Sequence, residues 1–229
     1  MRKNGSRLIS FRQYRLTDIF MFALILCVSE LIIFFASKYW FKSSADYYVS
    51  FLLPIVLIVM MRWGWVSVVY AALGGVLACA LGGGSWQSYL SYGTGYCLVA
   101  LLLLMTKFLG RDRIRGKWYF SLLFVVLGWA AMNFGASAVG AICGESFAGL
   151  LAGNFGFGTN GFLSLAAGVV TILIVRKLDG MFEYQKSYLR RLDDERKEKM
   201  RRDEYGDEPV EIDEESLSIL KRWDDGLGK

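Results

Sequence analysis

Charge-poor apolar segments dominate this sequence between Thr17 and Val175, and they constrain its fold more than any other feature. Charged side chains are scarce in these segments, and the basic residues gather in the short stretches between them. The chain is 55% hydrophobic overall, which is high for a soluble globular domain. Apolar residues clustered in this way predict several membrane-spanning helices rather than one large soluble core.

Six segments have the composition expected of membrane spans, and they predict an all-α membrane protein built as a six-transmembrane-helix bundle. Thr17 or Asp18 is the expected N-cap of the first span. The second span is short and contains Pro54, so we expect it to be kinked or to start earlier. It should end in a turn at residues 62–65 with two interfacial indoles. The predicted spans are residues 17–36, 48–61, 66–81, 94–109, 118–142 and 160–175.

Lys and Arg residues occupy alternate links between these spans. They occur before the first span and after the second, fourth and sixth, whereas the remaining links contain only Lys38 and Lys42. Basic loops tend to stay on the cytoplasmic side of a membrane. The pattern predicts a multi-pass cell-membrane protein with cytoplasmic N- and C-termini, most simply in a bacterial plasma membrane. Its expected parts are a basic N-terminus (1–16), a transmembrane domain (17–177) and a charged cytoplasmic tail (178–229).

The composition argues against several classes of catalytic and metal-binding site. The chain has no His, which argues against catalytic triads, His-based zinc sites and haem ligation. Its four Cys lie in or beside apolar segments without CxxC spacing, so neither a metal site nor a cofactor is expected. The net charge of +5 is explained by basic loops and does not indicate nucleic acid. The Gly-rich runs 82–84 and 153–158 lack the Lys-Ser/Thr of a phosphate-binding loop, so we interpret them as flexible outer loops.

Polar residues within the apolar region converge on the predicted outer half of the membrane. Residues 129–160 are apolar but rich in Gly, Ala and Ser, and are interpreted as the outer part of the fifth span, a Gly-rich turn and the start of the sixth. Glu30 lies in the outer half of the first span, and an ionisable residue in a span is a functional candidate. Apolar and aromatic walls with a few polar groups are typical of a small-molecule pocket. The predicted substrate-binding residues are Glu30, Trp86, Gln87, Tyr89, Tyr92, Trp129, Asn133, Asn154 and Asn160.

Each of these residues also has a structural interpretation that the sequence leaves open. Glu30 can pair within the bundle, and Asn133 can join two helices. The aromatic residues 86, 89 and 92 can form an interfacial belt instead of a lid. Glu145 is expected to be exposed and is not included among the site residues.

The segment FLLPIVLIVMMRWGW at 51–65 is followed by the Gly/Ala-rich VVYAALGGVLACALGG at 68–83. This order resembles the S components of energy-coupling factor (ECF) transporters, and the resemblance extends over about residues 15–177. It implies a subunit that captures a vitamin or related micronutrient outside the cell. That subunit then topples against a transmembrane T component driven by two cytoplasmic ATPases. The family's Ala-xxx-Ala face on the first helix is matched only by Ala23 and Cys27.

Two other functions remain open. One is a membrane assembly or scaffold factor whose acidic tail docks a cytoplasmic partner through a short helix at 214–223. The other is a membrane-embedded enzyme, which would need a nucleophile and a base. Without His, only Ser, Glu30 or Glu145 could supply them, and no GxSxG motif is present.

Overall fold

The computed structural model describes residues 11–40, 49–155, 160–178 and 180–205. The chain divides into two compact units, residues 1–185 and 186–229. Every regular element in the described residues is a helix. Those of the first unit are α1 (Phe11–Trp40), α2 (Leu52–Trp63), α3 (Val66–Gly82), α4 (Trp86–Gly95), the 3-10 helix η1 (Tyr96–Leu101), α5 (Leu102–Phe108), α6 (Arg111–Gly116), α7 (Trp118–Ile142), α8 (Phe147–Phe155) and α9 (Asn160–Val175).

Three helical stretches are long and apolar enough to cross a membrane, judged by length and composition: Gln13–Tyr39, Trp86–Phe108 and Trp118–Ile142. Three further apolar helices are shorter: Leu52–Trp63, Val66–Gly82 and Gly161–Val175. At 1.5 Å per residue these reach about 18 to 26 Å, less than a typical hydrocarbon core of roughly 30 Å. The long apolar helices indicate that the protein associates with a membrane.

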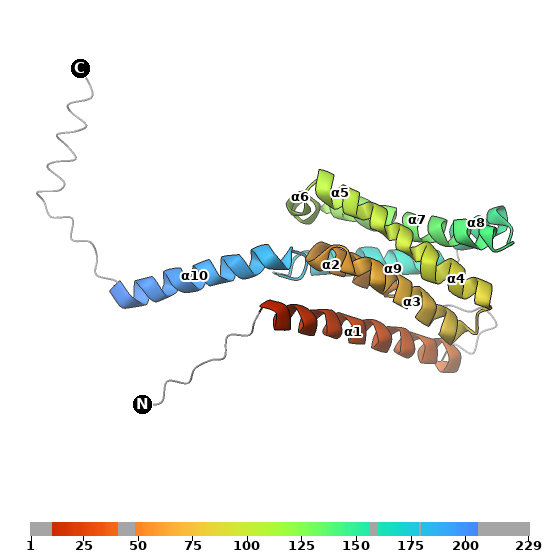
Figure 1. The fold of residues 1–229 in the computed structure, drawn as a ribbon, viewed down its shortest axis with the longest axis horizontal. Coiled ribbons are helices and arrows are strands. Elements are labelled where there is room, and N and C mark those ends of the chain that lie inside the picture. The colour runs from red at the N-terminus through yellow and green to blue at the C-terminus, as the bar shows by residue number, and fades with distance from the viewer. Residues whose placement is uncertain (1–10, 41–48, 156–159, 179, 206–229) are drawn as a thin grey trace, which may run out of the picture. The chain divides into compact units, whose positions relative to one another are not determined.

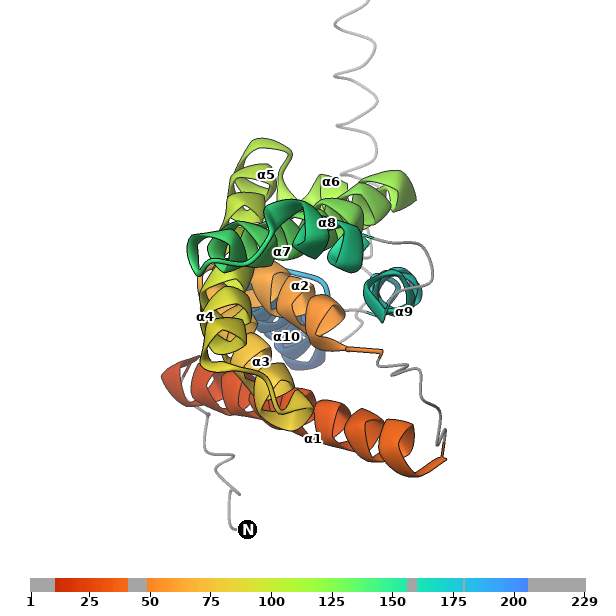
Figure 2. The same ribbon diagram turned by 90° about the vertical axis from the view of Figure 1, so that its right-hand side faces the viewer.

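The long helices of residues 1–185 run alongside one another, so successive connections alternate between two ends of this bundle (Figure 1). Helix α7 packs on α4, η1 and α9, whereas α1 lies at the margin against α3 and α2 (Figure 2). The connections at one end, called the basic end below, carry Arg62, Arg111, Arg113, Arg115, Lys117, Arg176 and Lys177. At the opposite end, the charged residues in the described part of the chain are Lys38 and Glu145.

Glycines allow α4 and α7 to approach until their backbones touch. A Cβ added at Gly135 would stand 2.0 Å from the Gly95 carbonyl oxygen, and one at Gly95 would stand 2.5 Å from Ala136 Cα. Small residues at helix contacts permit this kind of packing in membranes. On α3, Gly75 contacts the Tyr92 backbone in the same way, while nothing lies within 4 Å of a Cβ at Gly82.

Several predicted boundaries are wrong. Helix α1 begins at Phe11, so Asp18 lies inside the helix and is not its N-cap. Pro54 lies in the first turn of α2, where its missing N–H removes no helical hydrogen bond, so the proline does not require a kink. Residues 86–93 were predicted as part of a link but belong to α4, with Ser85 as its N-cap accepting from the Ser88 amide at 3.3 Å. Helices predicted at 66–81, 118–142 and 160–175 are confirmed as α3, α7 and α9.

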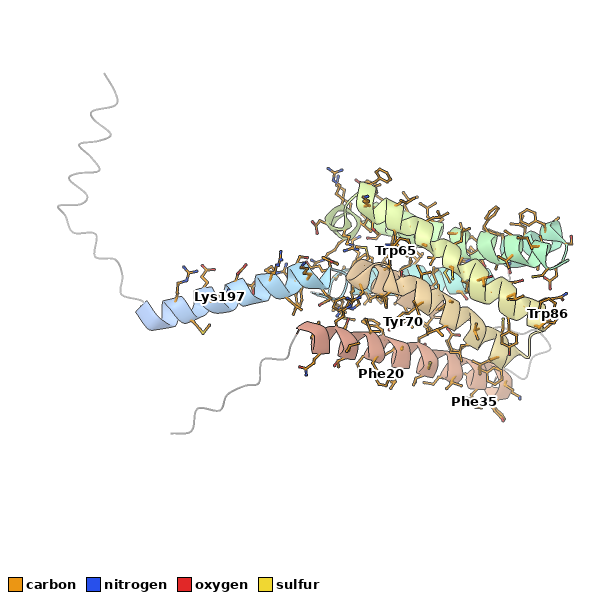
Figure 3. The ribbon with its side chains drawn as sticks, viewed as in Figure 1. Phe20, Phe35, Trp65, Tyr70, Trp86 and Lys197 are labelled. Atoms are coloured by element: carbon orange, nitrogen blue, oxygen red, sulfur yellow. The ribbon has the colours of Figure 1, made fainter. Side chains whose placement is uncertain are left out.

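The second unit contains α10 (Gln185–Tyr205), which starts at the last residue of the first unit. This helix is highly charged, and Lys197 is one of its exposed side chains (Figure 3). Arg191 and Glu195 form an i,i+4 ion pair at 3.7 Å, a spacing that supports a solvated helix. The predicted helix at 214–223 lies outside the described residues.

Candidate functional site

Glu30 is buried in an otherwise apolar stretch of α1, with an exposed fraction of 1%. Its Oε1 accepts a hydrogen bond from Ser50 Oγ at 2.8 Å. The Ser50 amide donates in turn to Ser164 Oγ at 2.9 Å. Burying a carboxylate is costly unless hydrogen bonds stabilise it. The Glu30 carboxylate therefore joins α1 to the segment before α2, and through Ser50 to α9.

A second set of hydrogen-bonded side chains links α7 to α8 and to the start of α9. Asn133 Nδ2 donates to the Trp129 carbonyl at 3.0 Å, and Ser137 Oγ donates to the Asn133 carbonyl at 2.9 Å, both within α7. One bond between helices comes from Asn154 Nδ2, which donates to Ser137 Oγ at 3.1 Å. Trp129 Nε1 donates to the Gly161 carbonyl at 2.9 Å. The Asn133 amide thus donates within its own helix, whereas Asn154 and Trp129 form the hydrogen bonds between α7 and the neighbouring segments.

Three of the predicted aromatic residues, Trp86, Tyr89 and Tyr92, lie on α4, where helical spacing points them in different directions. Trp86 is 67% exposed at the first residue of α4 (Figure 3). Gln87 is half-buried and donates from Nε2 to the Cys143 carbonyl at 3.3 Å. Tyr92 packs edge-to-face on Tyr96, with ring centroids 5.4 Å apart. Tyr92 is half-buried and packs on a residue one turn further along the same helical stretch, while Trp86 faces outward.

The predicted site residues accordingly form more than one group. Tyr92 packs on Tyr96, whereas Glu30 is hydrogen-bonded to Ser50, in the segment before α2. Trp129 and Asn154 belong to the α7–α9 group described above, and Gln87 lies at the end of α7. Tyr89 is half-buried on α4, and the side chain of Asn160 lies outside the described residues. No three His, Cys, Asp or Glu residues in the described part are grouped so as to hold a metal ion.

Sequence reasoning missed the serines that complete these groups. Ser50 and Ser164 are separated by 114 positions, and Ser137 lies in a run of small residues whose pattern does not distinguish it. A weak signal was present, because each serine stands within or beside an apolar span, where a hydroxyl needs a partner.

The basic end contains a buried ion pair that the sequence did not reveal. Arg62 Nε and Nη2 donate to the two Asp18 carboxylate oxygens at 3.0 and 2.7 Å. Trp63 Nε1 donates to the same carboxylate at 2.5 Å, so this indole is buried rather than interfacial as predicted. Trp65, in contrast, is 72% exposed. Arg62 Nη1 also donates to the Gly180 carbonyl at 2.5 Å. The hydrogen bonds among Asp18, Arg62, Trp63 and Gly180 thus link α1 to α2 and to the segment after α9.

The segment after α9 also contacts α6. Arg115 pairs with Glu183, and the Arg111 guanidinium lies 4.3 Å from the Tyr184 ring centroid. Burial lowers the pKa of Arg111, and the neighbouring Tyr184 opposes this shift. These contacts hold residues 183–184 against the basic end. We interpret them as stabilising the fold and not as part of a ligand-binding pocket.

Comparisons with protein-family models, with curated proteins and with solved structures found no match.

Proposed function

We propose that this protein is the membrane-embedded substrate-capture subunit of a vitamin or micronutrient uptake transporter powered by separate ATPase subunits. The observation that carries the proposal is the buried Glu30 carboxylate, which accepts a hydrogen bond from Ser50 Oγ. An ionisable group inside an apolar helix marks a functional site by default. A buried carboxylate is suited to orient a small molecule in an otherwise apolar pocket.

The proposed topology has six spans, with both termini cytoplasmic, in a bacterial plasma membrane. Two observations support it: connections alternate between the two ends of the bundle, and basic residues gather at one of them. In this orientation Glu30 belongs to the outer half of the membrane, where substrate arrives. The short α2, α3 and α9 would cross with the help of neighbouring helices and of local bilayer thinning.

The proposed partners are a transmembrane T component, two cytoplasmic ATPases and the lipid bilayer, as the resemblance to ECF S components implies. The marginal helix α1 supports this assignment, because its outward face is apolar and exposed. On that face Cys27 is exposed and Ala23 half-buried, and Phe20 and Phe35 are 66% and 52% exposed (Figure 3). Such a face can pack against lipid or against another membrane subunit.

One observation favours the alternative of a scaffold factor that docks a cytoplasmic partner. The second unit of the chain, residues 186–229, contains the highly charged helix α10. In the scaffold alternative, this unit is the functional part and the helices serve as an anchor.

Co-purification in a mild detergent separates these functions. Mass spectrometry of a tagged preparation should find a T-like membrane protein with two ATPases, or one stoichiometric micronutrient. Glu30→Gln keeps an acceptor for Ser50 but removes the charge, so it should leave the protein folded and lower the ligand content. A cytoplasmic partner alone, lost when residues 186–229 are deleted, would reject the uptake function and support the scaffold.

A further inference from the structure

Basic residues from two helix ends meet at the Gly116 carbonyl. Arg176 directly follows the last residue of α9 and donates from Nη2 to this carbonyl at 3.3 Å. Gly116 is the last residue of α6, and Lys117 after it is exposed. Lys177 follows Arg176 and is exposed as well. The hydrogen bond therefore gathers Lys117, Arg176 and Lys177 at one point of the basic end, called the Lys117 cluster below.

Ion pairs do not neutralise this cluster in the part of the chain that the structure describes. The ion pairs found there include none of its three residues. Two acids belong to neighbouring segments: Glu183 pairs with Arg115, and Asp112 is exposed in the first turn of α6. Three cations thus stand against one exposed carboxylate, so the cluster attracts anions.

Exposed aromatic side chains stand beside the cluster, where α7 begins. Trp118 and Tyr119 are 61% and 46% exposed, and their rings pack edge-to-face with centroids 6.2 Å apart. Lys117 Nζ lies 5.8 Å from the Tyr119 ring centroid. Exposed Trp and Tyr residues are typical of the level at which lipid headgroups lie. The Lys117 cluster is therefore at headgroup level in a membrane that α7 is long and apolar enough to cross.

An exposed apolar row continues from the cluster along α7. Tyr119, Leu123 and Leu127 are all exposed, and their spacing of four residues places them on one face of the helix. Lipid tails are as apolar as leucine side chains, so this row suits acyl chains. A cationic cluster next to an apolar row matches a phospholipid with an anionic headgroup, because that molecule carries both parts. A free phosphate ester would use only the cluster.

We propose that the Lys117 cluster binds the phosphate of an anionic phospholipid. Lys117 Nζ and Arg176 Nη2 donate charge-assisted hydrogen bonds to the phosphate oxygens, and an acyl chain lies along the exposed row of α7. Basic sites between membrane helices on the cytoplasmic side are suited to anionic headgroups. The inference goes beyond the proposed uptake function and does not depend on it, because it requires only that α7 lies in a membrane.

The test uses the full chain, purified in dodecyl maltoside and stripped of lipid. Native mass spectrometry measures its affinity for phosphatidylglycerol and for phosphatidylcholine with the same acyl chains, whose headgroup has no net charge. Phosphatidylglycerol should bind at least about 10-fold more tightly, because several cations face its phosphate. Equal affinity for the two lipids would overturn the proposal.

A matched pair of lysines tests the position of the site. Lys117→Gln should lower the affinity for phosphatidylglycerol about fivefold, the effect of one basic residue near an anionic headgroup. The control is Lys38→Gln, because Lys38 is an exposed lysine at the opposite end of the bundle, with Nζ 5.7 Å from the Phe34 ring centroid. This control should leave the affinity unchanged. An equal loss in the two variants would show that the lipid responds to overall charge, and would overturn the cluster as its site.

Arg176 also stabilises the fold through Gly116, so its charge is tested separately. Arg176→Gln should lower the affinity for phosphatidylglycerol about 10-fold, as expected for one hydrogen bond between charged groups. Arg176→Lys keeps the cation and should retain more of the affinity. Thermal unfolding without anionic lipid is measured for every variant, and Lys117→Gln should unfold at the same temperature as the wild type. Equal affinity losses in Arg176→Gln and Arg176→Lys would show a purely structural role and overturn the proposal.

A soluble headgroup distinguishes a lipid from a free phosphate ester. Glycerophosphoglycerol is the headgroup of phosphatidylglycerol without its acyl chains. It should not displace the intact lipid, because it has no chain to contact the row on α7. Displacement at concentrations similar to those of the lipid would show that the cluster binds soluble phosphate esters, and would overturn the assignment to a phospholipid.

Discussion

Replacing Arg62 by Met should destabilise the membrane domain by about 3–5 kcal/mol, the range for removing one partner of a buried ion pair. Arg62 and Asp18 have side chains that are 5% and 15% exposed. The substitution removes two hydrogen bonds to Asp18, one to the Gly180 carbonyl and the contact with the Phe22 ring at 5.3 Å. Asp18 would keep only its bond from Trp63 among the contacts described. A carboxylate held by one donor in a buried position is the main source of the cost.

A double-mutant cycle isolates the pair from the surrounding packing. Asp18→Asn removes the negative charge and leaves the guanidinium with the Gly180 carbonyl. The double variant should cost less than the sum of the two single changes, with a coupling of about 2–3 kcal/mol, near the upper limit for residues in contact. The measurement is equilibrium unfolding in dodecyl maltoside with increasing sodium dodecyl sulfate, followed by tryptophan fluorescence.

The control is Arg113→Met, because Arg113 is an exposed arginine at the same end of the bundle. Its effect should stay within about 0.5 kcal/mol, as for most surface substitutions. The reasoning is refuted if Arg62→Met costs no more than this control. Additive single effects would also refute it, because they would show that Asp18 and Arg62 do not stabilise each other.

Two further changes test the helix packing and the topology. Gly135→Ala should cost about 1–3 kcal/mol, because its Cβ would overlap the Gly95 carbonyl oxygen, and should exceed the cost of Gly82→Ala, where the space is open. Similar losses for the two glycines in the same unfolding assay would show that backbone contact between α4 and α7 is not required. For topology, Ser146→Cys and Lys117→Cys are made separately after the native cysteines are replaced by Ser. A membrane-impermeant maleimide should label position 146 in intact cells and position 117 only after permeabilisation, and the reverse pattern would disprove cytoplasmic termini.

The helices that the sequence predicted best are those whose signal is local. Three of them are continuous apolar runs, at residues 66–82, 118–142 and 160–175. In hydrocarbon, a single segment can form all its backbone hydrogen bonds internally only as a helix. Helix α4 was missed because its Gly, Ser and Tyr residues have weak local preference for a helix. It is helical in the structure because Gly93 and Gly95 let it pack closely on α3 and α7.

Asp18 shows how a local rule can give the wrong role. Because Asp18 stands near the start of an apolar run, the sequence predicted it as a helix N-cap. In the structure it instead pairs with Arg62, which lies 44 positions away. Glu145 was likewise expected to be exposed because it stands in a Gly-rich loop, but it is half-buried in the structure. Its placement beside Ser91 depends on the turn at Gly144 and on the packing of α4 against α7.

The sequence by itself determined that the protein is helical and apolar, that its basic residues alternate between links, and that Glu30 is an unusual carboxylate in an apolar segment. Those properties follow from side-chain chemistry and from the backbone's need for hydrogen bonds in a membrane. Only the tertiary structure decided which side chains share a site. Ser50 reaches Glu30 across 20 positions, and Ser91 lies beside Glu145 because glycine contacts set how closely α4 and α7 pack. Contacts between side chains of different helices depend on the distance between those helices, and no periodicity along the chain specifies that distance.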